Sequence, residues 1–258
     1  MTLRTILVTG SNQGLGMHIV HQLASTPNVL VFMSGSSTKF VLDVHPSSTV
    51  VPVQLDITDD NSVTAAQVFI SDFIKEKGLQ ASIFLSSSFL KIKTPTAISS
   101  AAIGAHSFKA VYEVNIFGTV AVTDAFRPLL NNDGTILNVS SGLGSISAYT
   151  RRPAPLVFPA YASSKTALNA LTVQWELQEE QKGSAIRVVS IDPGHNRTNL
   201  NKFTGGMPPA DGCKVIVDAA LEKGGKTAVF LNRDGEVAWW NPDFISRIEY
   251  QIVGKDSL

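Results

Sequence analysis

Short apolar runs alternate with longer segments of helical period along this chain of 258 residues. The apolar runs are rich in branched residues, which is typical of strands. We expect strands at about 3–9, 28–33, 50–55, 81–86, 134–139, 186–191 and 227–231. Apolar residues three and four positions apart predict amphipathic helices at 15–25, 61–78, 108–130 and 161–181. This alternation indicates repeated strand–helix–strand units around a parallel sheet.

Several apolar runs, such as TILVT and IRVVSI, are almost continuous. Parallel strands look like this when helices cover both faces of their sheet. The pattern predicts an α/β fold with a doubly wound, parallel, seven-stranded sheet and helices on both faces. Pro128 should end or kink the third helix. Residues 142–159 and 203–212 read as loops, and no long linker divides the chain, so residues 1–258 are expected to form one domain.

The composition is that of a globular protein, with 44% apolar and 16% charged residues. Basic and acidic residues, 21 of each, cancel, and no run of like charge could follow a nucleic acid. A single cysteine, Cys213, offers neither an internal disulfide nor a metal cluster. There is no secretory signal pattern and no stretch of roughly 20 apolar residues. We expect a cytoplasmic protein that binds no nucleic acid, no membrane and no metal.

Three glycines in VTGSNQGLG, namely Gly10, Gly14 and Gly16, follow the first strand and open the first helix. A turn without side chains lets the backbone approach a pyrophosphate, and the free N–H groups of the helix face its charge. The spacing G-x3-G-x-G differs from the common G-x-G-x-x-G. A second reading, in which the glycines only shape a tight turn, therefore stays open.

The end of the second strand is where dinucleotide-binding folds select their cofactor. A carboxylate there would bind the ribose hydroxyls of NAD and repel the 2′-phosphate of NADP. The sequence instead has Ser34, Ser36, Ser37 and Lys39, with no acid before Asp43. NADP is therefore favoured over NAD, although serines are also ordinary loop residues.

Two other polar residues have a functional and a structural interpretation. Asp56 in LDITDD follows the third strand, where its side chain either reaches an adenine or caps the turn before the next helix. Asn115 lies in the third predicted helix at a position that faces the sheet. A buried asparagine needs hydrogen-bond partners or has a function. The structural interpretation is a hydrogen bond that kinks the helix.

The main candidate chemistry is YASSK, in which Tyr161 precedes Lys165 by one helical turn on the same face. A tyrosine hydroxyl titrates at about pH 10, and a neighbouring cation and the helix N-terminus behind Pro159 would lower that value. The alternative is a buried tyrosine beside a solvated lysine. Ser140 and Ser141 end the fifth strand, at the sheet edge where such folds bind ligands, and a hydroxyl there can polarise a carbonyl oxygen.

Taken together, these features resemble the short-chain dehydrogenase/reductase family in its single-domain form. The resemblance is carried, over roughly residues 4–200, by TGSNQGLG, Asp56, Asn115, NVSS, YASSK and DPGHNRT. It implies a Rossmann sheet and hydride transfer between NADP(H) and a carbonyl or alcohol of a small organic substrate. It also implies a homodimer or homotetramer built on the third and fourth predicted helices. Val120, Leu168 and Trp175 would lie on the outer faces of these helices or in the core.

The resemblance implies a role for each matching residue. Tyr161 would donate the proton, and Lys165 would lower its pKa and hold the nicotinamide ribose. Ser141, the second serine of its pair, would orient the substrate oxygen, and Asn115 would hold a water that links Lys165 to solvent. The residues expected to bind the cofactor are Gly10, Asn12, Gly14, Leu15, Gly16, Ser34, Ser36, Asp56, Ile57, Ser86, Tyr161, Lys165, Pro193 and Thr198. His195 is interpreted as a loop residue.

The chain also departs from the family. FLSSSFL puts Ser86 to Phe89 where the family carries Asn-Asn-Ala-Gly, which alters the nicotinamide floor and points a bulky ring toward the substrate site. Ser141 and Tyr161 are 20 positions apart, and the intervening AYTRRPAPLVFP is expected to wall the pocket. The segment 203–213 is short for a substrate lid, which suggests an open site.

Two functions remain open from the sequence. The first is an NADP-dependent carbonyl reductase, supported by the set Asn115, Ser141, Tyr161 and Lys165. The second is a non-redox Rossmann protein, either an NADP-binding sensor or a scaffold for isomerisation or cyclisation. Only the change at Ser86 to Phe89 supports this second function, because fold alone does not fix function.

Overall fold

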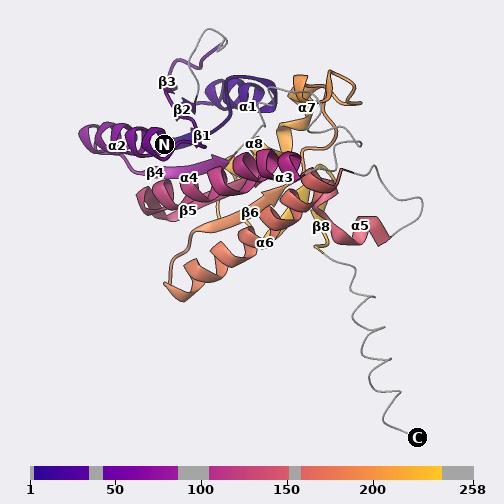
Figure 1. The fold of residues 1–258 in the computed structure, drawn as a ribbon. Helices are drawn as coiled ribbons and strands as arrows, with labels where there is room; N and C mark the ends of the chain where they lie inside the picture. Colours follow the sequence, from indigo (N-terminus) through magenta and orange to yellow (C-terminus); the bar gives the residue numbers. More distant parts are fainter. Residues whose placement is uncertain (1–2, 35–42, 87–104, 151–157, 240–258) are drawn as a thin grey trace, which may run out of the picture.

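The computed structural model describes residues 3–34, 43–86, 105–150 and 158–239. Their strands form one sheet in the order β3-β2-β1-β4-β5-β6-β7-β8 (Figure 1). The strands are β1 (Arg4–Val8), β2 (Val29–Ser34), β3 (Thr49–Val53), β4 (Ala81–Ser86), β5 (Leu130–Val139), β6 (Arg187–Ile191), β7 (Val229–Asn232) and β8 (Gly235–Val237). Strands β1 to β7 pair in parallel, which confirms the expected α/β fold with a doubly wound Rossmann sheet.

The sequence predicts seven strands, and the sheet has eight. The additional strand, β8, pairs antiparallel with β7 through a tight turn. In this turn the backbone N–H of Asp234 donates to the side-chain oxygen of Asn232 at 2.8 Å. The three residues of β8 are exposed or half-buried, so hydrophobicity does not mark them as a strand.

Helices cover both faces of the sheet (Figure 1). The helical elements are α1 (Gly14–Ala24), α2 (Asp60–Glu76), α3 (Ala105–Tyr112), η2 (Glu113–Gly118), α4 (Thr119–Phe126), η3 (Arg127–Leu129), η4 (Gly142–Gly144), α5 (Ile146–Thr150), α6 (Pro159–Gln181), η5 (Asn199–Asn201), α7 (Pro209–Gly212) and α8 (Lys214–Leu221). One core lies under α1 and α8, and a second lies under α2, α4 and α6. Neighbouring residues of β5 alternate between them, with Leu137 in the first core and Ile136 in the second.

Of the two positions that the sequence allows for Val120, Leu168 and Trp175, the outer helix faces or the core, the structure shows the core. Leu168 and Trp175 are only 1% and 5% exposed, and Val120 packs against the same core. These three residues therefore stabilise the fold of the chain itself. The exposed apolar side chains on η2 and α6 are Phe117 and Leu177, which are 58% and 40% exposed.

The third predicted helix is interrupted. α3 passes into the π-helix η2, then into α4 and the 3-10 turn η3. Pro128 lies in η3 and β5 follows directly, which confirms that the helix ends near this proline. A Cβ on Gly118 would lie 2.8 Å from the carbonyl oxygen of Ile57, so this glycine lets η2 pack closely against the loop after β3.

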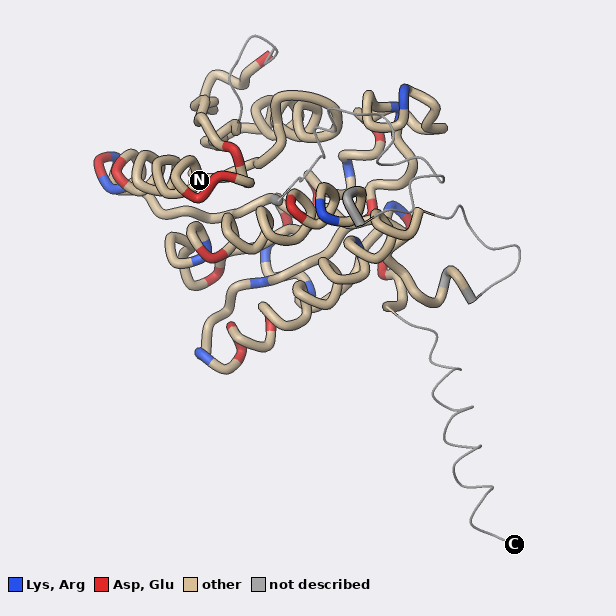
Figure 2. The backbone as a smooth tube through the Cα atoms, in the orientation of Figure 1, with Lys and Arg blue, Asp and Glu red and all other residues tan. Residues whose placement is uncertain are grey.

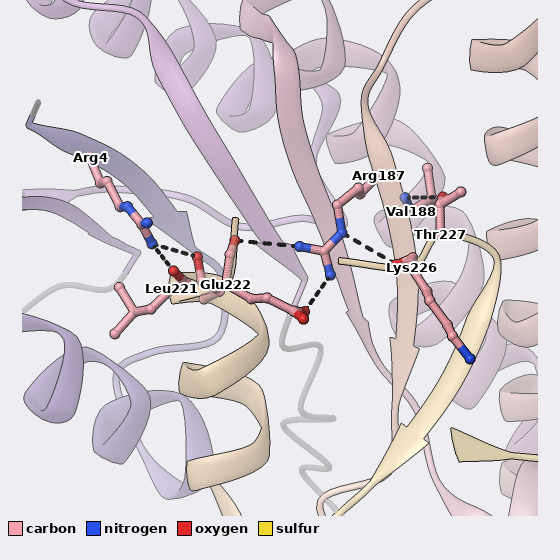
Figure 3. A network of polar contacts seen from close by, with 8 residues as sticks. Arg4, Arg187, Val188, Leu221, Glu222, Lys226 and Thr227 are labelled. Atoms are coloured by element: carbon pink, nitrogen blue, oxygen red, sulfur yellow. Dashed lines mark hydrogen bonds and ion pairs between the residues drawn. The ribbon is translucent and has the colours of Figure 1, made fainter. Parts of the chain in front are cut away.

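Two arginines join the carboxyl end of α8 to the amino ends of the strands (Figure 3). Arg4 of β1 donates to the carbonyl oxygen of Leu221. Arg187 of β6, which is 6% exposed, donates to the carboxylate of Glu222 at 3.0 Å and to the carbonyl oxygen of Lys226 at 3.3 Å. Cations satisfy the free carbonyl groups of a helix end and its dipole. These contacts hold the carboxyl end of α8 at the amino edge of the sheet.

Figure 2 shows basic and acidic residues interspersed along the described backbone. One ion pair is almost fully buried: Arg127 Nε lies 2.7 Å from Glu179 Oε1 and joins η3 to α6. Burial opposes ionisation of Glu179, but hydrogen bonds from Lys182 and Ser184 and the charge of Arg127 hold its pKa below the ordinary value. Among the described helices, none is both long and apolar enough to cross a membrane.

Candidate active site

The turn between β1 and α1 has the shape expected of a phosphate cradle. Gly10 and Gly14 have φ of +58° and +55°, a left-handed conformation that side chains rarely adopt. A Cβ on Gly16 would lie 2.4 Å from the carbonyl oxygen of Gly10, so only glycine permits this close turn. Gln13, the residue before α1, makes no side-chain hydrogen bond to the first turn of the helix. The N–H groups of that turn therefore face the cradle without a side-chain cap.

Two side chains hold the cradle in place. The buried Ser11 hydroxyl donates to the carbonyl oxygens of Val8 at 2.9 Å and of Ser34 at 2.8 Å, which ties the turn to the end of β2. Asn199 donates from its side chain to Gln13 Oε1 at 2.8 Å. This contact brings the loop after β6 alongside the glycine turn, although the two segments lie far apart in sequence.

Other residues expected to bind the cofactor surround this cradle. Thr198 is 4% exposed, caps η5 and lies beside Gly14, where its Cγ2 would be 3.9 Å from an added Cβ. Asn12 is exposed, whereas the side chain of Leu15 is buried in the core, so only the backbone of Leu15 faces the turn. Pro193 is the second residue of the loop after β6.

Asp56 and Ile57 follow β3. Asp56 is exposed, and its Oδ1 accepts hydrogen bonds from the backbone N–H and the hydroxyl of Thr58 at 3.0 and 2.7 Å. Asp59 is the N-cap of α2, and Asp56 caps the turn that leads into this helix, which is the structural role weighed for it. Asp56 shapes the turn, and its carboxylate stays at the surface.

Several expected site residues lie outside the described residues, namely Ser36, Ser87 to Phe89 and the part 151–157 of the segment between Ser141 and Tyr161. Ser86 is the last residue of β4, where its backbone pairs with Asn138 of β5.

Tyr161 and Ser141 meet at the carboxyl edge of the sheet. Tyr161 lies on the first turn of α6, which begins at Pro159, a residue suited to a helix start. Ser141 follows β5, and its hydroxyl makes a hydrogen bond with that of Tyr161. Ser141 Oγ also accepts from the backbone N–H of Leu143 at 3.2 Å, which caps η4 and fixes the serine.

Lys165 lies deep beneath this pair. Its side chain is 2% exposed, and its Nζ donates to the carbonyl oxygen of Val139 at 2.8 Å. The same nitrogen is 5.8 Å from the centre of the Tyr161 ring. Burial disfavours the ammonium and lowers the pKa of Lys165 to about 8.

The pKa of Tyr161 is raised to about 12, above all by burial of the phenol. The hydrogen bond with Ser141 lowers it, and Asp192 and Tyr149 raise it further. The role expected of Lys165, to lower this pKa, stays a prediction. The ammonium is bound to a backbone carbonyl, and desolvation of the phenol dominates.

Asn115 finds a partner across the helix interface. It is 1% exposed and donates from Nδ2 to the hydroxyl of Ser164 at 2.9 Å. Ser164 in turn donates to the carbonyl oxygen of Tyr161 at 2.7 Å. The asparagine in the π-helix is thus connected to the first turn of α6 through one hydroxyl.

A row of polar contacts, which we call the polar seam, joins the end of β5 to one face of α6. The contacts, in order away from the sheet edge, are Ser141 with Tyr161, Val139 with Lys165, Ser140 with Asn169 and Asn138 with Thr172. The helix residues are three or four positions apart and so share one face. Ser140 is 3% exposed and donates to Asn169 Oδ1 at 2.6 Å, whereas Ser141 is the serine bonded to Tyr161.

A groove of about 1080 Å³ lies between α8 and the β7–β8 hairpin. Apolar side chains such as Met207 and Leu231 line it, together with charged ones such as Asp218 and Arg233. His195 and Pro193 also line it, and none of the four expected catalytic residues does. His195 therefore lies in a loop, as expected, and borders a surface separate from the polar seam.

Sequence reasoning misses three residues that shape this site: Ser11, Ser164 and Asn169. Asn169 and Ser164 are polar residues of a helix whose neighbours on the same face are buried. Asn169 follows Lys165 by four positions, so helical periodicity could have placed it on the same face. Nothing in the sequence shows that the Ser11 hydroxyl turns back to the strands.

Comparisons with known proteins agree with this geometry. Residues 4–207 match the family model described as short chain dehydrogenase. The short-chain dehydrogenase anuI of Penicillium roqueforti is 32% identical over 84% of this chain and 88% of its own length. The short-chain dehydrogenase/reductase tropE of Talaromyces stipitatus is 28% identical over 84% of this chain and 86% of its own. The chain therefore belongs to the short-chain dehydrogenase/reductase family of oxidoreductases.

Solved structures share the fold. The NADPH-bound carbonyl reductase from chicken fatty liver has a TM-score of 0.71 and 22% identity, over 93% of this chain and 95% of that one. The carbonyl reductase Sniffer of D. melanogaster has a TM-score of 0.73 and 20% identity, over 92% of this chain and 100% of that one. At such identities the likeness establishes the fold.

Proposed function

We propose that this chain is an NADPH-dependent reductase of a carbonyl group on a small organic molecule, and that residues 1–258 act as one catalytic domain. The observation that carries the proposal is the pair of hydrogen-bonded hydroxyls of Ser141 and Tyr161 above the buried Lys165. Two donors at one point are what a carbonyl oxygen needs as it becomes an alkoxide.

Tyr161 is the general acid. Its pKa of about 12 keeps the phenol protonated at neutral pH, so the proton is in place before reduction begins. An alkoxide is a stronger base than a phenolate, and the proton moves downhill from Tyr161 to the substrate oxygen. Ser141 orients that oxygen and then stabilises the phenolate. The reverse reaction passes through the same transition state and needs a deprotonated Tyr161.

Lys165 and Asn115 support this proton transfer. Lys165 places a cation beneath the ring of Tyr161 and would hold the hydroxyls of the nicotinamide ribose. Asn115 holds the first turn of α6 through Ser164 and would hold a water that connects Lys165 to solvent. These roles follow the family, and the burial of both side chains supports them.

The residues present fit a dinucleotide. The left-handed Gly10 and Gly14 and the close turn at Gly16 form a cradle whose uncapped N–H groups suit a pyrophosphate. Further contacts would come from Asn12, Leu15, Ser34, Ser36, Asp56, Ile57, Ser86, Pro193 and Thr198. Serines rather than an acid after β2 favour NADP over NAD, and the bound NADPH would supply the hydride.

We also propose a cytoplasmic homodimer or homotetramer, which the family implies. The exposed Phe117 and Leu177 on η2 and α6 support an interface on these elements. Light scattering of the wild type and of Phe117→Asp tests this, and a wild type that stays monomeric at micromolar concentration contradicts it.

The function is tested by mixing the protein with NADPH and a panel of ketones and aldehydes while following the absorbance of the reduced nicotinamide. Substrate-dependent oxidation is expected, faster with NADPH than with NADH. Tight NADPH binding without turnover across a broad panel would favour the second candidate, a non-redox sensor or scaffold. The substitution of Ser86 to Phe89 for the family's Asn-Asn-Ala-Gly is the observation on its side.

A further inference from the structure

The buried side-chain amide of Asn169 joins α6 to three other segments next to the proposed catalytic pair. Asn169 Oδ1 accepts a hydrogen bond from Ser140 at 2.6 Å and another from Ser190 at 2.7 Å. Its Nδ2 donates to the carbonyl oxygen of Gly144 at 3.4 Å. One amide therefore connects α6 to the end of β5, to the turn η4 and to β6.

The surroundings leave little room for these elements to shift. Asn169, Ser140 and Ser190 are 5%, 3% and 0% exposed, so each lost bond leaves a polar group without water. A Cβ on Gly144 would lie 2.9 Å from the carbonyl carbon of Lys165. The hydroxyl of Thr166 also donates to the Gly144 carbonyl at 3.0 Å. The turn η4 is thus pressed against the helix at the level of Lys165.

These contacts surround the residues proposed to react. Ser140 precedes Ser141, and Gly144 closes the turn that Ser141 caps. Lys165 lies one helical turn before Asn169 on the same face. A displacement of the Ser140–Asn169 contact would move Ser141 relative to Tyr161, because the two serines are adjacent in the chain.

We propose that Asn169 is a positioning residue that, through Ser140 and Gly144, sets the placement of Ser141 against Tyr161. This inference rests on the proposed reductase function. Asn169 touches neither reacting group, and it acts by fixing the end of β5 on α6. Misplacement of a reacting group by about 1 Å can cost roughly a hundredfold in rate, so a contact of this kind matters for turnover.

The chain offers a matched pair of variants. Ser140 and Ser190 donate to the same oxygen at nearly the same distance and are equally buried, but only Ser140 adjoins Ser141. Ser140→Ala is expected to lower kcat by roughly tenfold with little change in KM. Ser190→Ala is expected to keep kcat within about twofold, while its thermal midpoint falls as much as that of Ser140→Ala. Asn169→Ala should behave like Ser140→Ala where it folds.

The split between kcat and KM is the readout that a merely structural role would not move. A loss in kcat at nearly constant KM is expected in Ser140→Ala, and neither constant should change by more than about twofold in Ser190→Ala. Equal kcat losses in the two serine variants, or unchanged kcat in both, would overturn the positioning role.

A second measurement separates this inference from the proposed function. Hydrogen exchange at the backbone amides of Leu143 and Gly144 requires no substrate or cofactor, and both amides bond to Ser141. Faster exchange in Ser140→Ala than in Ser190→Ala supports the positioning role even if the wild type fails to reduce any carbonyl. Equal exchange in the two variants contradicts it, whereas a wild type without turnover contradicts only the reductase function.

Discussion

The Nζ of Lys165 donates to the main-chain carbonyl oxygen of Val139 at 2.8 Å, in a position where the lysine is 2% exposed. Lys165, which is expected to take part in catalysis, is therefore also part of the packing between α6 and β5. Burial lowers its pKa from 10.5 to about 8, which links the charge of this residue to the stability of the chain.

The stability of the wild type relative to Lys165→Met should rise with pH. Between pH 8 and 10.5 the unfolded chain holds a proton on this lysine that the folded chain has lost, so rising pH favours the folded state. From pH 7.5 to pH 10 the free energy of unfolding of the wild type should gain about 2 kcal/mol on that of the variant. Urea unfolding at both pH values measures this. A difference that shrinks as the pH rises would mean that the folded chain stabilises the ammonium of Lys165, which would contradict the lowered pKa.

Gly16→Ala should disrupt the phosphate cradle more than Gly14→Ala. A Cβ at position 16 would lie 2.4 Å from the Gly10 carbonyl oxygen, and this backbone contact can be relieved only by opening the turn. We expect Gly16→Ala to lower the free energy of unfolding by about 2 kcal/mol or more and to lose NADPH binding. At Gly14 there is space, with 3.6 Å to the side chain of Asn199, and only the positive φ costs about 1 kcal/mol. Fluorescence titration with NADPH and thermal unfolding measure both, and equal effects would place the close turn elsewhere.

Arg187→Leu should lower stability without changing catalysis. The carbonyl oxygen of Lys226 and the half-exposed carboxylate of Glu222 would lose their donor at the amino edge of the sheet (Figure 3). We expect a loss of about 2 kcal/mol in the free energy of unfolding and an unchanged kcat per folded molecule. Lys226→Ala is the control, because its ion pair with Glu236 is exposed and should contribute almost nothing. A fall in kcat in Arg187→Leu would mean that the two edges of the sheet are coupled.

Much of the fold follows from local pattern. Continuous apolar runs with helices between them predict seven strands that the structure contains, because strands buried on both faces have no polar side. The hairpin strand β8 and the short helix α8 escape prediction. The residues of β8 are held by backbone pairing at an edge, and α8 has only eight residues, too few to show a period.

The sequence predicts part of the candidate site but not its geometry. Spacing places Tyr161 and Lys165 on one helix face, and the structure agrees. The direction of the Lys165 ammonium depends on how deeply α6 packs on β5, which no local pattern contains. For the same reason the sequence gives no sign that burial raises the pKa of Tyr161, or that Asn169 receives both serine hydroxyls.

The central claim is that the Tyr161 hydroxyl delivers the proton that completes reduction of a carbonyl. Its most direct test is the single-turnover rate of NADPH oxidation by Tyr161→Phe, with a ketone that the wild type reduces, beside the dissociation constant for NADPH. Removal of one such donor typically costs about 10²–10³ in rate. We predict a loss of at least that size, with the dissociation constant changed by less than about threefold. A Tyr161→Phe variant that oxidises NADPH at the wild-type rate would contradict the account.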